Sequence, residues 1–256
     1  DNHNKYTIDK HYSKHFEDII YNPDNHFYFQ GIKFCNAYIV KNNNINNSNM
    51  EKENILEIIK YVKTSGEAYS GKDADIGYHS IELDGVYHLG QRDCLERLDI
   101  CKKEYDFTNK NVLDIGCCIG GMLFPLSKYI NYGCGIDFNF QNINAGNCLK
   151  QYKKIDNLSF FVFDLDKENT NFINNFINKI DVCFLFAVCM WIRKWKEVID
   201  FISLNSKVLF IETNGSKQQQ SKQIEYCKTK FEDVKEIFYN KDNDDKWCRK
   251  LYICKN

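Results

Sequence analysis

The sequence predicts an α/β protein built on a seven-stranded, mostly parallel sheet that ends in an antiparallel hairpin. From residue 111 onward, short apolar runs alternate with helical spacing, as in a parallel sheet covered on both faces. Strands are expected at 111–115, 133–137, 158–163, 181–186 and 206–212, and helices near 119–131, 139–152, 168–178, 191–204 and 216–228. Only a charged turn separates the last two apolar runs, 231–239 and 246–254, so they are expected to pair as a hairpin.

An extension of helices and hairpins is expected before the sheet, with residues 1–105 forming a lid over substrate or cofactor and 106–256 forming the sheet domain. We expect a helix around 11–20, a strand or an irregular cap within 27–40, a solvated loop at 41–49 (KNNNINNSN) and a surface helix at 50–63.

The stretch that leads into the sheet carries two local signals. Apolar residues alternate around Asp84-Gly85, which predicts a two-residue hairpin. Asp93 is expected to cap a helix that runs through Ile100, with Glu96 three residues after the cap.

Length and composition set further bounds. The chain has 256 residues, enough for one large domain with an extension, and a formal net charge of −1, which gives no broad basic surface for a polyanion. Its 12 cysteines are scattered without a Cys-x-x-Cys pair, so we expect free thiols and a reducing cytoplasm. There is no signal-peptide pattern and no membrane-spanning apolar run. Because the sequence does not begin with methionine, it leaves open whether a further segment precedes residue 1.

A strand, a tight glycine turn and a helix are predicted within NVLDIGCCIGGMLFPLSK, residues 111–128. The Gly-Lys-Ser/Thr of a phosphate-binding P-loop is absent. The spacing Asp114-x-Gly116-x-Cys118-x-Gly120 also differs from the dinucleotide pattern Gly-x-Gly-x-x-Gly. An acid two residues before the first glycine suits a ligand with a cationic amino group. An ordinary strand-to-helix turn is the alternative.

This turn resembles motif I of the class I S-adenosylmethionine (SAM) dependent methyltransferases, with Cys118 where many members have glycine. Two later runs, YGCGIDFN and LSFFVFDLD, place acids at Asp137 and Asp164. An acid in the first position can accept both ribose hydroxyls. The resemblance implies that Asp164 accepts the adenine amino group, that Leu165 and Phe138 flank the ring, and that the fold is the Rossmann-like methyltransferase sheet.

Residues 78–192 also resemble the methyltransferase domain of the O-antigen chain-terminating methyltransferase/kinases, through RDCLERLD, NVLDIGC and GIDFNFQNIN. This implies SAM contacts from Tyr78 and Arg92, the latter to the cofactor carboxylate, and an acceptor that is a saccharide or carries phosphate. Relatives with two adjacent histidines after the fourth strand differ, since Met190 and Trp191 occupy those places here, and no kinase motif is present. The predicted cofactor contacts are Tyr78, Arg92, Asp114, Gly116, Cys117, Gly120, Asp137, Phe138, Asp164, Leu165 and Phe186.

Catalytic residues are predicted less directly. All 6 histidines lie at or before His88, so a histidine base must come from the extension. His79 is preferred over His88 because it precedes the hairpin that leads to Arg92. Glu212, at the end of the fifth predicted strand, is a second candidate. Trp191 is either a wall of the substrate pocket or a structural residue.

We expect methyl transfer from SAM to an oxygen of a small molecule or glycan, without a metal, because no Asp/His cluster has metal-binding spacing. An RNA acceptor, such as tRNA, is the first alternative. Residues 1–49 carry five Lys against five Asp and Glu, and the aromatic run 27–29 suits bases as well as sugar rings. A SAM-binding module without catalysis is the second alternative. The sequence does not indicate an oligomeric state.

Overall fold

The computed structural model describes residues 18–22, 27–29, 32–34, 37–41, 52–62, 76–90, 92–239 and 249–256. The chain divides into two compact units, Asp1–Glu51 and Lys52–Asn256. The boundary predicted between residues 105 and 106 lies inside the second unit, and the role of the extension as a lid stays a prediction.

The described residues of the first unit are short strands. They are β1 (Asp18–Asn22), β2 (Phe27–Phe29), β3 (Ile32–Phe34) and β4 (Ala37–Lys41), with β1 antiparallel to β4 and β2 antiparallel to β3. The helix predicted at 11–20 is wrong at 18–20, where the β-branched pair Ile19-Ile20 favours the strand, and its residues 11–17 lie outside the described part. Of the two alternatives for 27–40, a strand or an irregular cap, the structure has strand, divided among β2, β3 and β4. Apart from Lys41, the predicted loop at 41–49 also lies outside the described part.

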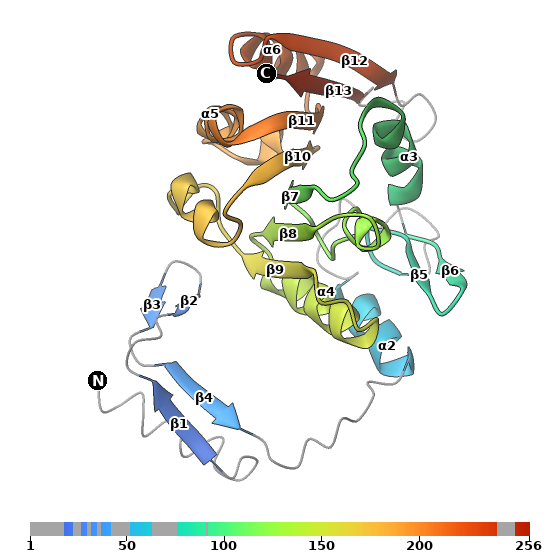
Figure 1. Ribbon diagram of the computed structural model, residues 1–256, viewed down its shortest axis with the longest axis vertical. Helices are drawn as coiled ribbons and strands as arrows, with labels where there is room; N and C mark the ends of the chain where they lie inside the picture. Colours follow the sequence, from blue (N-terminus) through green and yellow to red (C-terminus); the bar gives the residue numbers. More distant parts are fainter. Residues whose placement is uncertain are drawn as a thin grey trace. The chain divides into compact units, whose positions relative to one another are not determined.

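A seven-stranded sheet in the order β12-β13-β11-β10-β7-β8-β9 forms the centre of the second unit (Figure 1). The parallel strands are β7 (Asn111–Ile115), β8 (Tyr132–Asp137), β9 (Leu158–Val162), β10 (Ile180–Phe186) and β11 (Ser206–Glu212). β13 (Lys250–Lys255) runs antiparallel to both β11 and β12 (Asp233–Tyr239). The predicted fold class, a mostly parallel sheet with an antiparallel C-terminal hairpin, is confirmed.

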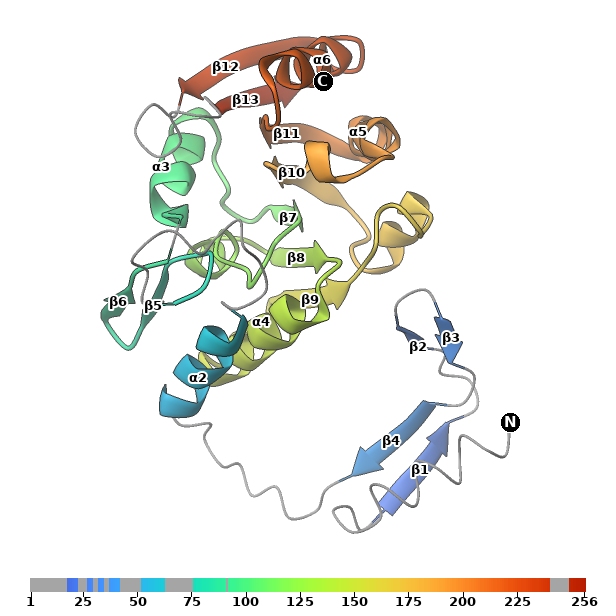
Figure 2. The ribbon, with the colours of Figure 1, turned by 180° about the vertical axis from the view of Figure 1, so that it is seen from behind.

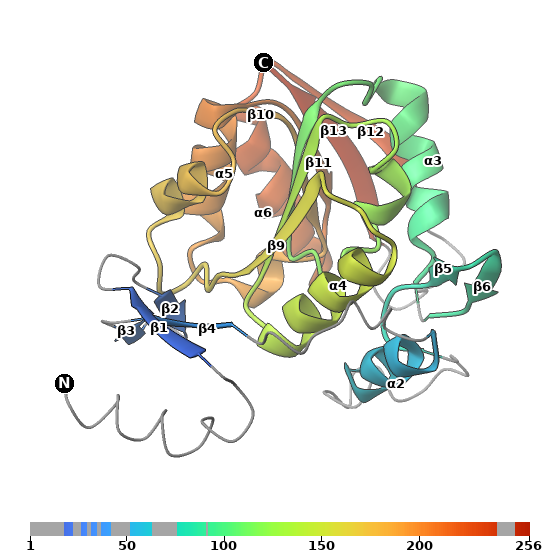
Figure 3. The same cartoon turned by 60° about the horizontal axis from the view of Figure 1, so that its bottom comes forward.

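Helices cover both faces of this sheet. Figure 3 shows α3 (Cys94–Glu104) and α4 (Phe140–Tyr152) on one face, and α5 (Trp195–Asn205) and α6 (Lys217–Lys228) on the other. The central strands are therefore buried almost throughout, which explains why they read as continuous apolar runs rather than as alternating ones. α2 (Lys52–Val62) confirms the predicted surface helix and packs along α4 (Figure 2).

Three predicted helices differ from the structure. Residues 119–131 form successive turns around the short 3-10 helix η2 (Phe124–Leu126) instead of an α-helix. Pro125 lacks a backbone N–H, and the bonds from Leu123 to Gly120 and from Leu126 to Leu123 span three residues, as in a 3-10 turn. The other two are shorter than predicted. η3 (Thr170–Asn175) lies within 168–178, and in place of a helix at 191–204 the short η4 (Cys189–Trp191) ends at residue 191 and α5 begins only at Trp195.

The part of the extension next to the sheet contains the predicted hairpin and the predicted capped helix. β5 (Ile81–Leu83) and β6 (Val86–His88) form the predicted hairpin, with positive φ angles at Asp84 (51°) and Gly85 (79°). Asp93 caps α3, because its Oδ1 accepts from the backbone N–H of Leu95 at 2.8 Å. Within the described ranges, no helix combines the length and apolar character needed to cross a membrane.

Candidate functional site

The carboxyl ends of the parallel strands bring the predicted acids to one edge of the sheet. Ile115 at the end of β7 is in register with Ile136 on β8, and Asp137 is in register with Val162 on β9. Asp164 follows β9 by two residues. In doubly wound sheets, ligands bind outside this edge. The structure therefore places Asp114, Asp137 and Asp164 along one side of the molecule.

Asp137 ties the glycine turn to the end of β8. Its Oδ2 accepts a hydrogen bond from the backbone N–H of Cys118 at 2.9 Å, and its Oδ1 accepts one from Asn139 at 2.8 Å. The residue is 9% exposed, and burial raises its pKa, although the two backbone bonds oppose that change. Each carboxylate oxygen has a further lone pair, so these bonds leave acceptor capacity for a ligand.

The turn itself depends on left-handed backbone angles. Gly116 and Gly120 have φ angles of 76° and 89°, and a Cβ atom on Gly116 would lie 2.5 Å from Cγ2 of Val188. Cys118 also has a positive φ, 52°, at the position where many of the resembled enzymes have glycine. The buried thiol of Cys117 packs towards β8, so only its backbone faces the ligand edge.

Replacing Cys118 by glycine is expected to stabilise the protein by roughly 0.5–1 kcal/mol, because the relief of a left-handed residue exceeds the added flexibility of glycine. Urea unfolding would measure the change. The matched variant Cys117→Gly has no positive φ to relieve and removes a fully buried thiol, so it is expected to lose on the order of 2 kcal/mol. Equal effects of the two changes would contradict the backbone argument.

Asp114 is the most confined of the three acids. It is 3% exposed, and its Oδ2 has no hydrogen-bond donor among the described residues. Burial, followed by repulsion from Asp137, raises its pKa to about 8, while Arg97 opposes the rise. A buried carboxyl oxygen without a partner beside a glycine turn fits a ligand that supplies an ammonium group.

The residues predicted to surround an adenine ring differ in how far their side chains are exposed. Phe138 is 73% exposed, whereas Leu165 is 9% exposed and belongs to the hydrophobic core. The carboxylate of Asp164 accepts from the backbone N–H of Asp166 at 3.0 Å and forms an ion pair with Lys167 at 2.8 Å. Phe186, at the end of β10, is partly buried against Phe184, with 5.1 Å between the ring centroids.

The segment before α3 is docked on the glycine turn through His79. His79 pairs with Arg92 as a parallel bridge, and the N–H of Arg92 donates to the carbonyl of Tyr78 at 2.9 Å. A Cβ atom on Gly121 would lie 2.7 Å from Nδ1 of His79, so the imidazole lies directly over the backbone of the turn. Tyr78, His79 and Arg92 are thus brought to the predicted cofactor edge.

The pKa of His79 is too low for a general base near pH 7. His79 is 5% exposed, and burial, with a smaller contribution from Arg97, lowers its pKa to about 3. A neutral imidazole with so low a pKa has little affinity for a proton near pH 7. His88 lies on β6 and is partly exposed. The catalytic role of either histidine stays a prediction.

Arg97 and Glu212 form a buried ion pair that joins α3 to the end of β11. Nη2 of Arg97 lies 3.0 Å from Oε2 of Glu212 and donates to Oε1 at 3.3 Å, and the two side chains are 9% and 5% exposed. Arg97 also interacts with the hydroxyl group of Tyr78. Glu212 is therefore the counter-ion of Arg97, and its role as a base also stays a prediction.

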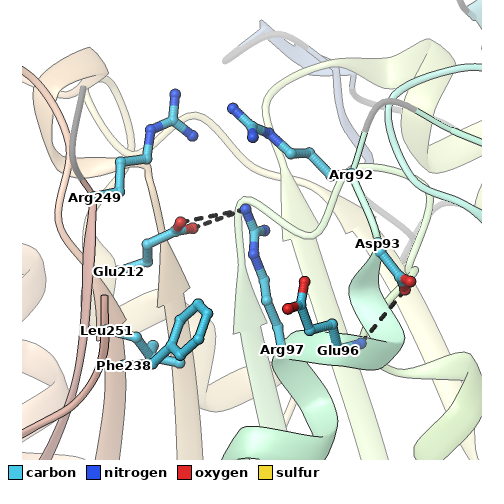
Figure 4. Close-up of a pocket in the computed structure, with 8 residues that line it drawn as sticks. All are labelled: Arg92, Asp93, Glu96, Arg97, Glu212, Phe238, Arg249 and Leu251. Carbon is cyan, nitrogen blue, oxygen red and sulfur yellow. Dashed lines mark hydrogen bonds and ion pairs between the residues drawn. The ribbon is translucent and has the colours of Figure 1, made fainter. Parts of the chain in front are cut away.

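A pocket lies over this ion pair (Figure 4). Its walls come from the segment before α3, from α3 itself and from the strands β11, β12 and β13, and it is lined by Arg92, Asp93, Glu96, Arg97, Glu212, Phe238, Arg249 and Leu251. Among the described residues, no group of three or more His, Cys, Asp or Glu side chains is placed to hold a metal ion.

The loop after β10 is held by a residue that sequence reasoning missed. Asn214 is fully buried; its Oδ1 accepts from the N–H of Met190 at 2.9 Å, and its Nδ2 donates to the carbonyl of Ala187. Trp191, in the same loop, is 64% exposed. The position of Asn214 directly after Glu212-Thr213 was the available signal, because residues that follow a parallel strand lie at the carboxyl edge of the sheet, where ligands bind. Arg97 and Arg249 were also missed: Arg97 is revealed by its distant partner Glu212, and Arg249 by its place in the lining of the pocket.

No protein-family model and no curated protein matches the sequence, but many solved structures share the fold. The N-terminal domain of EvdMO1 with SAH bound matches with a TM-score of 0.60 and 11% identity, over 81% of this chain and 98% of that one. The bifunctional kinase-methyltransferase WbdD matches with a TM-score of 0.54 and 21% identity, over 65% of this chain. Magnesium protoporphyrin IX methyltransferase (ChlM) from Synechocystis PCC 6803 with bound SAM matches with a TM-score of 0.50 and 12% identity, over 64% of this chain and 78% of that one.

At these identities, the likeness establishes the fold: the chain has the fold of SAM-dependent methyltransferases. The matched region spans only 40% of the kinase-methyltransferase. The activity and acceptors of that longer protein therefore do not carry over as findings.

Proposed function

We propose that this chain is a SAM-dependent methyltransferase that methylates an oxygen atom of a small molecule or of an acceptor bearing a saccharide or a phosphate. The observation that carries the cofactor assignment is the buried, unpartnered carboxyl oxygen of Asp114 beside the glycine turn of this fold. That oxygen matches the ammonium group at the amino-acid end of SAM.

The other edge residues fit the rest of the cofactor. Asp137 keeps acceptor capacity for the ribose hydroxyls, and Phe138 offers an exposed ring for the adenine. Tyr78 and Arg92 lie on the segment docked over the turn and suit the carboxylate. The contacts proposed in full are Tyr78, Arg92, Asp114, Gly116, Cys117, Gly120, Asp137, Phe138, Asp164, Leu165 and Phe186.

When bound, SAM supplies an activated methyl group on its sulfonium. What remains for the protein is to align the acceptor oxygen with that methyl group and to exclude water. We propose that Trp191 forms part of the acceptor wall, since it is exposed in the loop that Asn214 holds. If the acceptor oxygen is a hydroxyl, it loses its proton as the bond to the methyl carbon forms, and we propose that His79, Glu212 or solvent water takes that proton; an acceptor oxygen that is already an anion has no proton to lose.

Binding of SAM, or of its demethylated product SAH, is expected to raise the melting temperature. At about 100 times its Kd, a ligand adds about 2.7 kcal/mol to the free energy of unfolding, or a rise of roughly 5–10 °C. Asp137→Ala is expected to remove most of this rise, whereas Asp156→Ala, on an exposed acid away from the turn, is expected to keep it. A chain that responds to NAD but not to SAM or SAH would contradict the proposal.

Turnover is tested by methyl transfer from labelled SAM to cell extract separated into small molecules, glycans, RNA and protein. We expect label in the small-molecule or glycan fraction, and full activity in the presence of a chelator. Label in the RNA fraction that ribonuclease removes would replace the proposed acceptor. Retained SAM affinity without transfer to any fraction would identify a binding module.

A further inference from the structure

Asn214 is completely buried, and its side-chain amide bonds to the loop 187–194, which follows the neighbouring strand. It comes two residues after β11, which pairs with β10 (Figure 1). Its Oδ1 accepts from the N–H of Met190 at 2.9 Å, and its Nδ2 donates to the carbonyl of Ala187. A buried amide is costly unless its polar atoms are bonded. These two bonds therefore fix the start of the loop 187–194.

The contact between Asn214 and Ala187 is held from both sides. Gln223 on α6 fixes Asn214, because its Nε2 donates to the carbonyl of Asn214 at 2.9 Å and its Oε1 accepts from the N–H at 3.2 Å. Ala187 has a φ angle of 56°, in the left-handed region that residues with a Cβ rarely adopt. Its N–H donates to the carbonyl of Glu212 at 2.9 Å. Such a conformation persists only where its surroundings hold it, and here the stretch 212–214 does so.

The loop 187–194 brings Trp191 next to the glycine turn. Val188 packs directly on the turn, because a Cβ atom on Gly116 would lie 2.5 Å from its Cγ2. The N–H of Trp191 donates to the carbonyl of Val188 at 2.9 Å. Cys189 and Ile192 are 1% and 8% exposed, whereas Trp191 between them is 64% exposed. The indole ring is therefore the side chain of this loop that an acceptor beside the turn would meet.

Asp166, which follows β9, holds the far end of the same loop. Its Oδ1 accepts from the backbone N–H groups of Arg193 at 2.8 Å and of Lys194 at 3.1 Å. Loss of the bonds from Asn214 would therefore release only the part of the loop that carries Trp191, while the end at Asp166 stays anchored.

We propose that Asn214 is a positioning residue for the methyl acceptor: it fixes the indole ring of Trp191 beside the glycine turn, where the acceptor is aligned with the methyl group. This inference rests on the proposed function. Asn214 touches neither cofactor nor acceptor, since it is fully buried and its amide is bonded to the loop. It acts through Trp191.

Fluorine NMR of the full chain labelled with 5-fluorotryptophan tests the position of Trp191 directly. The sequence has 3 tryptophans, and the signal that is lost in Trp191→Phe identifies the loop residue. We expect Asn214→Ala to shift or broaden this signal, because the start of the loop is released. The control Asn157→Ala removes an asparagine whose Nδ2 also donates to two backbone groups, the carbonyls of Ser127 and Ile130, and is expected to leave the signal unchanged. An unchanged signal in Asn214→Ala would overturn the inference.

Kinetics distinguish a positioning role from a general loss of structure. In the extract fraction that takes up labelled methyl groups, we expect Asn214→Ala to lower kcat/KM about tenfold or more, with a Kd for SAH close to that of the wild type. Trp191→Ala is expected to have a similar effect. The double variant Trp191→Ala/Asn214→Ala is expected to be little worse than either single variant, because both changes act through one ring. Effects that multiply in the double variant would overturn the inference.

SAH affinity separates the failures. Loss of SAH affinity in Asn214→Ala would overturn the inference, because the loop would then serve the cofactor. Wild-type chain that binds SAH and transfers methyl groups, with equal kcat/KM in Asn214→Ala, would overturn the inference and leave the proposed function intact. Wild-type chain that binds no SAH would overturn both.

If Asn214→Ala does not fold, Asn214→Asp carries the same comparison. A neutral carboxyl group can donate to Ala187 and accept from Met190 as the amide does, whereas the carboxylate cannot donate. Because burial raises the pKa of a carboxyl group, the neutral form is expected at about pH 5.5 and the charged form at about pH 9. We expect the Trp191 signal of this variant to match that of the wild type at the lower pH and to differ from it at the higher pH. A match at both pH values would overturn the inference.

Discussion

Replacing Arg97 by methionine is expected to destabilise the fold by about 3–5 kcal/mol, because the change leaves the carboxylate of Glu212 buried without its cation. Both side chains are at least nine-tenths buried, and their charged atoms lie 3.0 Å apart. The same change removes the guanidinium that interacts with Tyr78 and opposes the pKa rise of Asp114. Thermal unfolding is expected to shift down by roughly 10 °C.

The double variant Arg97→Met/Glu212→Leu distinguishes the loss of the ion pair from the loss of the other contacts of Arg97. Removing both charges leaves no unpaired buried ion, so the double variant is expected to recover most of the lost stability. Lys235→Met breaks an exposed ion pair with Glu104 and is expected to cost less than about 1 kcal/mol. A double variant as unstable as Arg97→Met alone would show that the arginine acts through other contacts.

The sheet and its acids could be predicted because each rests on a local pattern. Parallel strands buried on both faces appear as continuous apolar runs, and an acid directly after such a run must lie at the carboxyl edge. Asp137 and Asp164 follow from that rule, and Asp114, inside β7, follows from its position two residues before Gly116. Their separate environments do not: only the fold shows that Asp137 holds the N–H of Cys118 while Asp114 keeps a partnerless oxygen.

The features that could not be predicted depend on residues far apart in the chain. Arg97 and Glu212 are separated by 115 positions, and no period or motif connects them. Arg249 follows a stretch read only as a charged turn, and its place in the pocket depends on how β13 is added to the sheet. The helix predicted after the glycine turn was wrong for a local reason, because Pro125 has no backbone N–H to donate within an α-helix.

Without cofactor, the stability of the protein is expected to fall as the pH rises from about 4 to about 8, owing to Asp114. Its pKa is raised from 3.8 to about 8 in the folded state, mainly by burial and then by Asp137. Below pH 4, both states hold the proton. Between these values, the unfolded chain releases the proton while the folded chain keeps it, so the free energy of unfolding decreases, by on the order of 5 kcal/mol in total. Urea unfolding at several pH values would measure this slope.

Asp114→Asn is expected to flatten that slope and, at pH 8 without cofactor, to be more stable than the wild type. The amide keeps the volume but carries no charge to bury. SAH binding is expected to weaken in the same variant, because the ammonium group loses its carboxylate, and wild-type binding near pH 7 is expected to release a proton that the variant does not release. Calorimetry in two buffers of different ionisation enthalpy measures that proton.

The control variant is Asp181→Asn. The pKa of Asp181 is lowered, because the bonds from Asn111 and Lys179 outweigh the opposing effect of burial. This variant is therefore expected to leave the slope of stability between pH 5 and 8 unchanged. A wild-type slope that Asp114→Asn does not alter would place the buried proton on another group.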